Sequence, residues 1–128
     1  VFYVQYAYAR INSIFKMLNM NIDDKIKINN EKFYLNIHEQ QILRKISEWP
    51  KCVQTCADKL EPHRIPFFLY DLVTMFHSYW NLGNTNKDFR FITNNKPTNK
   101  SKLLLLKGLS TVIKNGMSLL GVSTPKTM

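Results

Sequence analysis

The sequence predicts an all-α protein, a single domain over residues 1–128 that folds as one bundle of about five helices. Three observations lead to this prediction. Apolar residues recur at the i, i+3 and i+4 spacing of helices in five segments, and no segment carries the turn chemistry of a β-hairpin. Apolar residues make up 45% of the 128-residue chain, enough for one hydrophobic core. Prolines and polar runs separate the five segments.

The first expected helix covers residues 1–20. Its apolar side chains fall close to helical spacing, and we expect Gln5, Arg10, Asn12 and Lys16 on its outer face. The helix is therefore amphipathic, with one face available for a core.

A polar loop and a second helix follow. Residues 21–34 are rich in Asp and Asn and predict a loop. Residues 35–48 return to a helical pattern, with Ile37, Leu43 and Ile46 expected to point inward. A Trp-Pro pair directly after this segment ends that helix or begins the next one.

Three further helices complete the expected bundle. Residues 51–60 predict a short amphipathic helix, and residues 63–81 predict a long helix that is apolar and aromatic enough to be buried. Residues 82–99 are polar and predict the longest loop. Residues 101–118 predict the last helix, and residues 119–128 an irregular tail.

The charge balance points to a polyanionic partner. The chain carries 18 Lys and Arg residues against 9 Asp and Glu residues, a net charge of +9. Such an excess is typical of proteins that bind nucleic acid. A solvated basic surface without a ligand would have the same composition, so charge alone leaves both interpretations open.

The composition excludes several other functions. No apolar run is long enough to span a membrane. No glycine-rich phosphate loop, paired carboxylate cluster or catalytic triad is present. Cys52 and Cys56 are at i, i+4 spacing, which neither bridges within one helix nor, without nearby histidines, builds a zinc site. So few cysteines fit a reducing compartment, and we expect a cytoplasmic protein.

Aromatic side chains gather at two places on the expected helices. Tyr3 and Tyr6 share one face of the first helix, and Tyr79 and Trp80 end the fourth helix just before the long polar loop. Exposed rings beside lysines can hold the unstacked bases of an RNA. The same rings could instead belong to the core, so the residues alone leave their role open.

Three segments together resemble the C-terminal domain of arginyl-tRNA synthetases. Residues 4–14 read VQYAYARINSI, residues 61–81 contain EPHRI, YDL and FHSYWN, and residues 115–128 read NGMSLLGVSTPKTM. They are similar to that family's VQYAHARIxSI helix, its EPHRIxxYLYDLAxxFHxFYN segment and its VLxNGLxLLGIxxPERM terminus. The order and spacing agree, and the resemblance covers essentially the whole chain.

The resemblance implies a DALR-type anticodon-binding domain, which is an α-helical bundle. It implies that the chain is the C-terminal fragment of a class I ligase that joins arginine to its tRNA with ATP and Mg²⁺. The ATP-site signatures of that family are absent, so we expect no cofactor in this fragment and no activity by itself. The expected partners are the anticodon stem-loop of arginine tRNA and the catalytic domain of the same chain.

The resemblance also implies which side chains meet the tRNA. We expect Tyr6 and Trp80 to stack on a base or wall it in, the region of Met128 to pack beside a base, and lysines near the loops to hold phosphates. Trp80 stands where the family has Tyr, and Lys102 where it has Arg. The expected anticodon-binding residues are Tyr6, Arg10, Tyr79, Trp80, Lys102 and Met128.

Three residues of the matching motifs are expected to be structural. His63 and Arg64 would cap and brace a helix junction, and Asp71 would brace a helix. The alternative function is a helical protein-interaction module without RNA specificity. A third possibility, an independent catalytic domain, has no candidate catalytic residues.

Overall fold

The computed structural model describes residues 1–27, 32–94, 96–97 and 99–128. In this part of the chain five α-helices form, together with a short 3₁₀ helix and a pair of two-residue strands. The elements are α1 (Phe2–Met17), α2 (Ile37–Ser47), α3 (Trp49–Lys59), α4 (Arg64–Leu82), η1 (Lys87–Phe89), β1 (Ile92–Thr93), β2 (Lys96–Pro97) and α5 (Lys100–Leu119).

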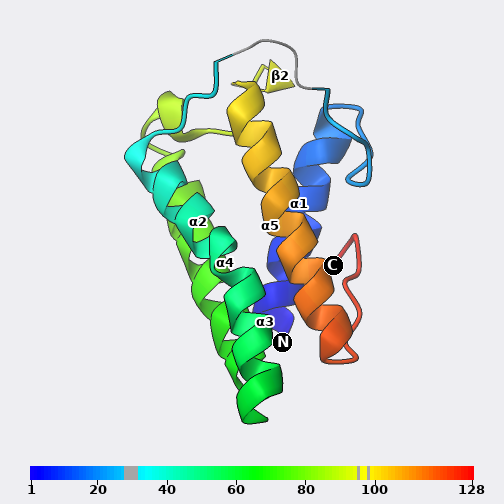
Figure 1. The fold of residues 1–128 in the computed structure, drawn as a ribbon. Helices are drawn as coiled ribbons and strands as arrows, with labels where there is room; N and C mark the ends of the chain where they lie inside the picture. Colours follow the sequence, from blue (N-terminus) through cyan, green and yellow to red (C-terminus); the bar gives the residue numbers. More distant parts are fainter. Residues whose placement is uncertain (28–31, 95, 98) are drawn as a thin grey trace.

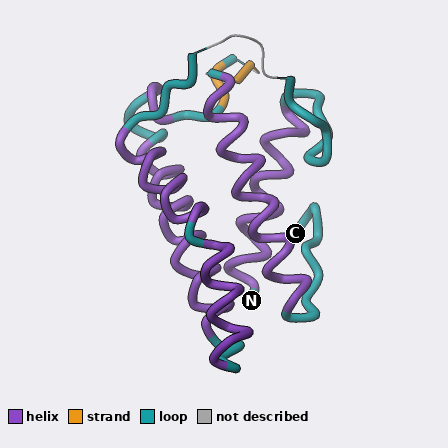
Figure 2. Tube along the Cα trace, viewed as in Figure 1, coloured by secondary structure: helices purple, strands orange, loops and turns teal. Residues whose placement is uncertain are grey.

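Helix α4 lies at the centre of the bundle and contacts each of the other four α-helices. Helices α2 and α3 follow one another along one side of it, while α1 and α5 pack together on the other side (Figure 1). The β1–β2 pair and residues 32–36, which precede α2, lie at one end of the bundle (Figure 2). Within the described residues, no helix is both long and apolar enough to cross a membrane.

Helices α1 and α4 run parallel to each other. The Tyr3 ring lies 5.3 Å from the Tyr70 ring near the start of both helices. The Arg10 guanidinium lies 5.0 Å from the Trp80 ring nearer their ends. The C-terminal parts of these two helices are therefore neighbours, and the functional site described below lies between them.

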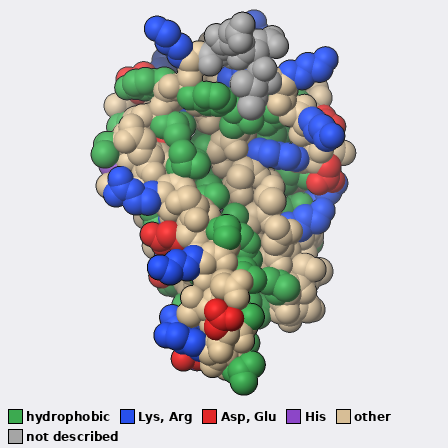
Figure 3. Space-filling view, in the orientation of Figure 1, with side chains coloured by type: hydrophobic (Ala, Val, Ile, Leu, Met, Phe, Trp, Pro, Cys, Tyr) green, Lys and Arg blue, Asp and Glu red, His purple; other side chains and the backbone are tan. Residues whose placement is uncertain are grey.

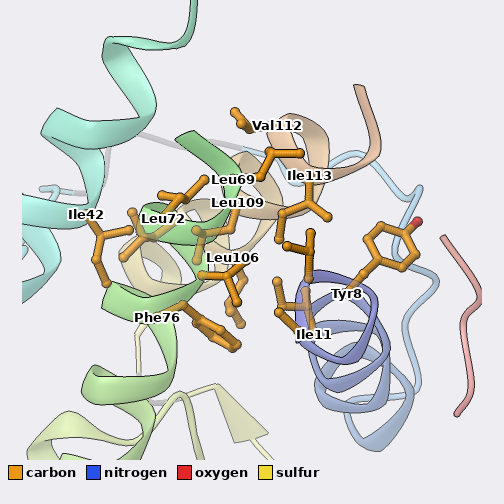
Figure 4. Close-up of a cluster of buried hydrophobic side chains, with 14 of the residues drawn as sticks. Tyr8, Ile11, Ile42, Leu69, Leu72, Phe76, Leu106, Leu109, Val112 and Ile113 are labelled. Atoms are coloured by element: carbon orange, nitrogen blue, oxygen red, sulfur yellow. The ribbon is translucent and has the colours of Figure 1, made fainter. Parts of the chain in front are cut away.

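The core is formed where α1, α4 and α5 meet (Figure 4). Burying one large aliphatic or aromatic side chain in such a core contributes about 1.5–3 kcal/mol to the stability of the fold. The large side chains without exposed surface are Ile11 and Phe15 of α1, Leu69, Leu72, Val73 and Phe76 of α4, and Leu106, Leu109 and Ile113 of α5.

A glycine allows α4 and α5 to approach closely. A Cβ atom at Gly116 of α5 would lie 2.8 Å from both Cδ atoms of Leu69 on α4, closer than real contacts allow. Any larger residue at position 116 would force the buried Leu69 side chain to move, so Gly116 allows this close packing.

The fold class and the five α-helices predicted from the sequence are confirmed, and their ends lie within a few residues of the prediction. The orientation predicted for α2 is wrong in part, because Ile37 and Leu43 are 62% and 47% exposed. The buried side chains of α2 are those of Glu39 and Ile42. The Glu39 carboxylate accepts a hydrogen bond from the backbone N–H of Asn36, which completes a capping box at the start of α2.

Asparagine side chains cap the N-termini of three helical elements. Asn36, Asn86 and Asn99 precede α2, η1 and α5, and each accepts a hydrogen bond from a backbone N–H of the first turn. The 82–99 loop thus contains η1 and the β1–β2 pair, which the sequence did not predict. These are short local structures, and a two-residue strand is too short to leave an alternating pattern.

Candidate functional site

A cavity of about 360 Å³ lies between residues 6–17 of α1, the end of α4 and the end of the tail. Its walls include Tyr6, Arg10 and Met17 from α1, Trp80 from α4 and Met128 from the tail. Four of the six residues expected from the sequence to meet tRNA therefore share one cavity. Tyr6 and Met128 are 47% and 61% exposed, so the cavity is open to a ligand.

Arg10 is the polar centre of this cavity. The Cζ atom of its guanidinium lies 5.0 Å from the ring centroids of both Tyr6 and Trp80, within range of a cation–π interaction with each. Its Nη2 donates to the Tyr6 hydroxyl over 3.3 Å, and its Nη1 lies 3.1 Å from Nδ1 of His77. These four side chains form one connected group in which the guanidinium is held in a defined plane.

His77 does not line the cavity, but its ring is hydrogen-bonded to Arg10. Arg10 can only donate a hydrogen bond, so Nδ1 of His77 is the acceptor and the ring proton is on Nε2. Burial of the ring, followed by repulsion from Arg10, lowers the pKa of His77. The imidazole therefore stays neutral at physiological pH and keeps its acceptor for the guanidinium. Among the described residues, its buried Nε2 has no hydrogen-bond partner.

The tail reaches the cavity because two amide side chains of α1 hold its backbone. Gln5 donates to the carbonyl of Ser123 over 2.9 Å, and Asn12 donates to the carbonyl of Lys126 over 3.0 Å. The tail thus runs along α1 and brings Met128 beside Arg10 and Met17. The expectation that Gln5 and Asn12 lie on the outer face is wrong, since both are only 9% exposed.

The spacing of these two amides is a sequence signal for the course of the tail. Gln5 and Asn12 are two helical turns apart and so lie on one face of α1. Two amides in such register can donate to an extended segment packed beside the helix. Their partners lie more than 110 residues away, so their role could not be seen from local periodicity.

Tyr79 and Lys102 do not take part in the cavity. Lys102 is 2% exposed, and its Nζ lies 2.7 Å from the Tyr79 hydroxyl, 2.7 Å from the Asp88 carbonyl and 2.9 Å from Oε2 of Glu39. An ammonium has three N–H donors, so all of them are engaged. The prediction that Tyr79 and Lys102 contact RNA is corrected by this geometry, because neither side chain has a free exposed polar group.

This buried network connects three helices. Glu39 of α2 accepts from the Tyr79 hydroxyl of α4 over 2.9 Å and pairs with Lys102 of α5. Asn36 adds a hydrogen bond to the same hydroxyl over 3.2 Å. Burial, together with the nearby Glu39 carboxylate, raises the pKa of Tyr79, so its hydroxyl stays protonated. The network is a structural element, since its polar groups are directed toward one another.

His63 and Arg64 lie at the junction of α3 and α4. His63 occupies the N-cap position of α4 but its side chain makes no capping hydrogen bond, so the expectation of a cap is wrong for this residue. Its ring packs edge-on against Phe67 at 6.3 Å instead. Arg64 pairs with Glu61, and this hydrogen bond lowers the pKa of the Glu61 carboxyl. The pair lies within the segment that joins α3 to α4.

Asp71 joins two helices. Its carboxylate lies 3.9 Å from Nζ of Lys45, which connects α4 to α2. The carboxylate is 64% exposed, so the pair contributes little to stability. The bracing role expected of Asp71 stays a prediction.

Basic side chains are spread over the surface, several of them beside the polar loops (Figure 3). Such charges attract a phosphate backbone without reading its sequence. Exposed lysines in or next to the loops are Lys16, Lys25, Lys27, Lys32, Lys87 and Lys96.

Known proteins are similar to this chain in sequence and in fold. Residues 4–128 match the family model described as "DALR anticodon binding domain". The chain is 48% identical over 128 residues to an arginine–tRNA ligase of Pelagibacter ubique and 36% identical over 135 residues to that of Rhizobium meliloti. Both matches cover 100% of this chain but only 22% and 23% of those ligases.

One solved structure has the same fold. A Campylobacter jejuni protein provisionally described as an arginyl-tRNA synthetase superposes with a TM-score of 0.77 at 24% sequence identity. The superposition covers 98% of this chain and 26% of that one. The helical arrangement is therefore shared at low sequence identity.

Proposed function

The chain belongs to the family of DALR anticodon-binding domains, and on this premise we propose that it binds the anticodon stem-loop of arginine tRNA. The observation that carries the proposal is the cavity in which Arg10 lies over the rings of Tyr6 and Trp80, with Met128 at its edge. Such a cavity combines flat apolar surfaces with a fixed set of N–H donors. These are the two elements that recognise an unstacked base.

Each part of the cavity has a separate task in this proposal. The rings of Tyr6 and Trp80 and the thioether of Met128 enclose the base. Arg10 uses two of its five N–H groups within the protein and can direct others to acceptor atoms on the base edge. His77 and Tyr6 hold the guanidinium in one orientation. The edge contacts would provide sequence discrimination, which a basic surface alone does not.

The exposed lysines would hold the phosphates around the loop. Contacts of this kind release counterions, so affinity must fall steeply as salt concentration rises. The alternative of a protein-interaction module predicts the opposite, because association through apolar surface depends weakly on salt. Salt dependence therefore separates the two functions.

The relatives suggest the role of the whole protein. Since the chain spans about 22% of the length of the Pelagibacter ligase, we propose that it is the C-terminal part of an arginine–tRNA ligase. The catalytic domain of the same chain would then use ATP and Mg²⁺, and the chain described here would contribute tRNA recognition. A cytoplasmic location follows from a role in protein synthesis.

A binding titration tests the proposal. A fluorescently labelled anticodon stem-loop of arginine tRNA is titrated with the 128-residue chain at low and moderate salt, and anisotropy is measured. The comparison is the same stem-loop with its middle anticodon base changed. We expect tighter binding to the native loop and weaker binding to both at higher salt.

Two variants make the titration specific. Arg10→Lys keeps the charge but loses the planar fork, so it should reduce the preference for the native loop. Arg44→Lys is the matched control, because Arg44 is exposed on α2 and lines no part of the cavity. Equal binding of both loops by the unmodified chain, or equal behaviour of the two variants, would contradict recognition at Arg10.

A further inference from the structure

A second cavity, of about 350 Å³, lies directly beside the first. It is enclosed by the end of α4 and by the chain between η1 and the turn after β1. Trp80 and Met17 line both cavities, so these two side chains form a wall common to both spaces. None of the residues predicted from the sequence to meet RNA, apart from Trp80, belongs to it.

We propose that this second cavity binds the base of the nucleotide next to the one held beside Arg10. The inference rests on the function proposed above and extends it to a second subsite. A single strand with splayed bases presents neighbouring bases to neighbouring pockets. Two cavities of nearly equal volume that share the wall formed by Trp80 and Met17 match this arrangement.

The chemistry of the second cavity fits a base. Its apolar surface comes mainly from Trp80, Phe89 and Phe91, and the rings of Trp80 and Phe91 are nearly parallel, with centroids 6.2 Å apart. Asn84 and Asn94, both exposed, add amide groups at the margin. Amides can donate to and accept from the polar edge of a base, as in the pairing of Asn with adenine.

The segment that forms this cavity is fixed to α4. Nε of Arg90 donates to the carbonyl of Gly83 over 2.6 Å, which ties the chain after η1 to the end of the helix. The buried Phe91 ring packs against Phe76 and Tyr79 of α4 as well as Trp80. The cavity is thus held from both sides before any ligand arrives, which reduces the entropy lost on binding.

One variant removes the amides without disturbing the backbone. Asn94 has a left-handed conformation with φ of 54°, which glycine adopts readily, so Asn94→Gly keeps the turn. Combined with Asn84→Ala, it removes both amide groups from the second cavity. Tyr6→Ala is the corresponding change in the first cavity. Asn115→Ala, an exposed site on α5 that lines neither cavity, is the control.

The experiment measures which loop nucleotide each cavity holds. Anticodon stem-loops are prepared with an abasic residue at each loop position in turn, and their affinities are measured by anisotropy. In the unmodified chain, two adjacent abasic positions should each weaken binding by roughly 5- to 150-fold. In the Asn84→Ala/Asn94→Gly variant, the penalty should shrink at one of these positions only. In Tyr6→Ala it should shrink at the other.

The outcomes separate this inference from the proposed function. If the penalties in the double variant equal those of the unmodified chain at every position, while Tyr6→Ala changes them at one position, the second cavity holds no base. The proposal of a second base-binding site would then be wrong, while the proposed anticodon binding at the first cavity would remain supported. If no abasic position weakens binding of the unmodified chain, the proposed function fails and the second subsite fails with it.

Discussion

Tyr79 and Trp80 are adjacent aromatic residues at the end of the same helix, yet they belong to opposite kinds of site. The Tyr79 hydroxyl points into a closed network with Glu39 and Lys102, in which each polar group has a partner. Trp80 forms a wall of two open cavities and lies beside Arg10. Two adjacent residues of α4 thus belong to a closed polar network and to the wall of two open cavities.

The difference shows that the contacts of a charged or aromatic side chain decide whether it stabilises the fold or remains available to a ligand. Lys102 and Arg10 are both cations beside an aromatic ring, at 5.4 Å and 5.0 Å from the ring centroid respectively. Lys102 is paired with the buried Glu39 carboxylate and has no free donor, whereas Arg10 contacts the neutral side chains of Tyr6, His77 and Trp80 and retains free donors. In the proposed function, the closed region contributes stability and the open region contributes binding.

The largest expected effect is on stability, from breaking the closed region. Lys102→Ala leaves the Glu39 carboxylate buried without its cation, which should lower the free energy of unfolding by about 3–5 kcal/mol. Adding Glu39→Gln should recover part of this loss, because the buried charge is removed. Chemical denaturation measures both variants. A stable Lys102→Ala protein with uniformly weakened RNA binding would show instead that Lys102 contacts phosphate.

The next effect is on binding, from breaking the open region. Trp80→Ala should weaken binding of the anticodon stem-loop by about 1–3 kcal/mol, since it removes the wall shared by the two cavities. Trp80→Phe keeps an aromatic surface and should lose less. Titration by anisotropy gives the affinities, and far-ultraviolet circular dichroism checks the fold. Unchanged affinity in folded Trp80→Ala would contradict the site.

A matched pair of hydroxyl deletions compares the two regions directly. Tyr79→Phe should cost about 1 kcal/mol of unfolding free energy, because Lys102 and Asn36 each lose a buried acceptor. Tyr6→Phe removes only the exposed hydrogen bond from Arg10 and should change stability by less than about 0.5 kcal/mol. Denaturant titrations under identical conditions provide the comparison. Equal losses would mean that the two tyrosines are equivalent.

The smallest effect concerns pH. The pKa of His77 is lowered in the folded chain, so the unfolded chain takes up its proton first as pH falls below about 6.5. The contribution of neutral His77 to stability is therefore complete above that pH and is lost as pH falls toward the folded pKa. His77→Gln should show a smaller loss of unfolding free energy between neutral and mildly acid pH. Identical pH profiles for the two proteins would contradict this role.

The sequence was sufficient for the helices and for the side chains that gather at the cavity. Helical periodicity located all five α-helices, and motif resemblance indicated Tyr6, Arg10, Trp80 and Met128. Periodicity failed at Glu39, because the inward face of α2 is set by a buried ion pair with Lys102, 63 residues later (102 minus 39). A pattern within one helix carries no information about such a partner.

The second cavity and the course of the tail were beyond prediction for the same reason. Phe89 and Phe91 looked like part of a polar loop, and only their packing on α4 gives them a fixed position. Gln5 and Asn12 looked like surface residues until the tail supplied carbonyl acceptors. Contacts between segments far apart in the sequence determine the position of Phe89 and Phe91 and the course of the tail.

The central claim, that RNA enters the cavity walled by Trp80, can be measured at that side chain. The chain has two tryptophans, and Trp49 is 8% exposed and packed against Phe68, so Trp49→Phe leaves Trp80 as the only tryptophan reporter. The anticodon stem-loop of arginine tRNA is titrated into this variant while Trp80 emission and RNA anisotropy are recorded together. We predict that emission changes saturably and in parallel with anisotropy. Binding by anisotropy with unchanged Trp80 emission would place the RNA elsewhere and contradict the claim.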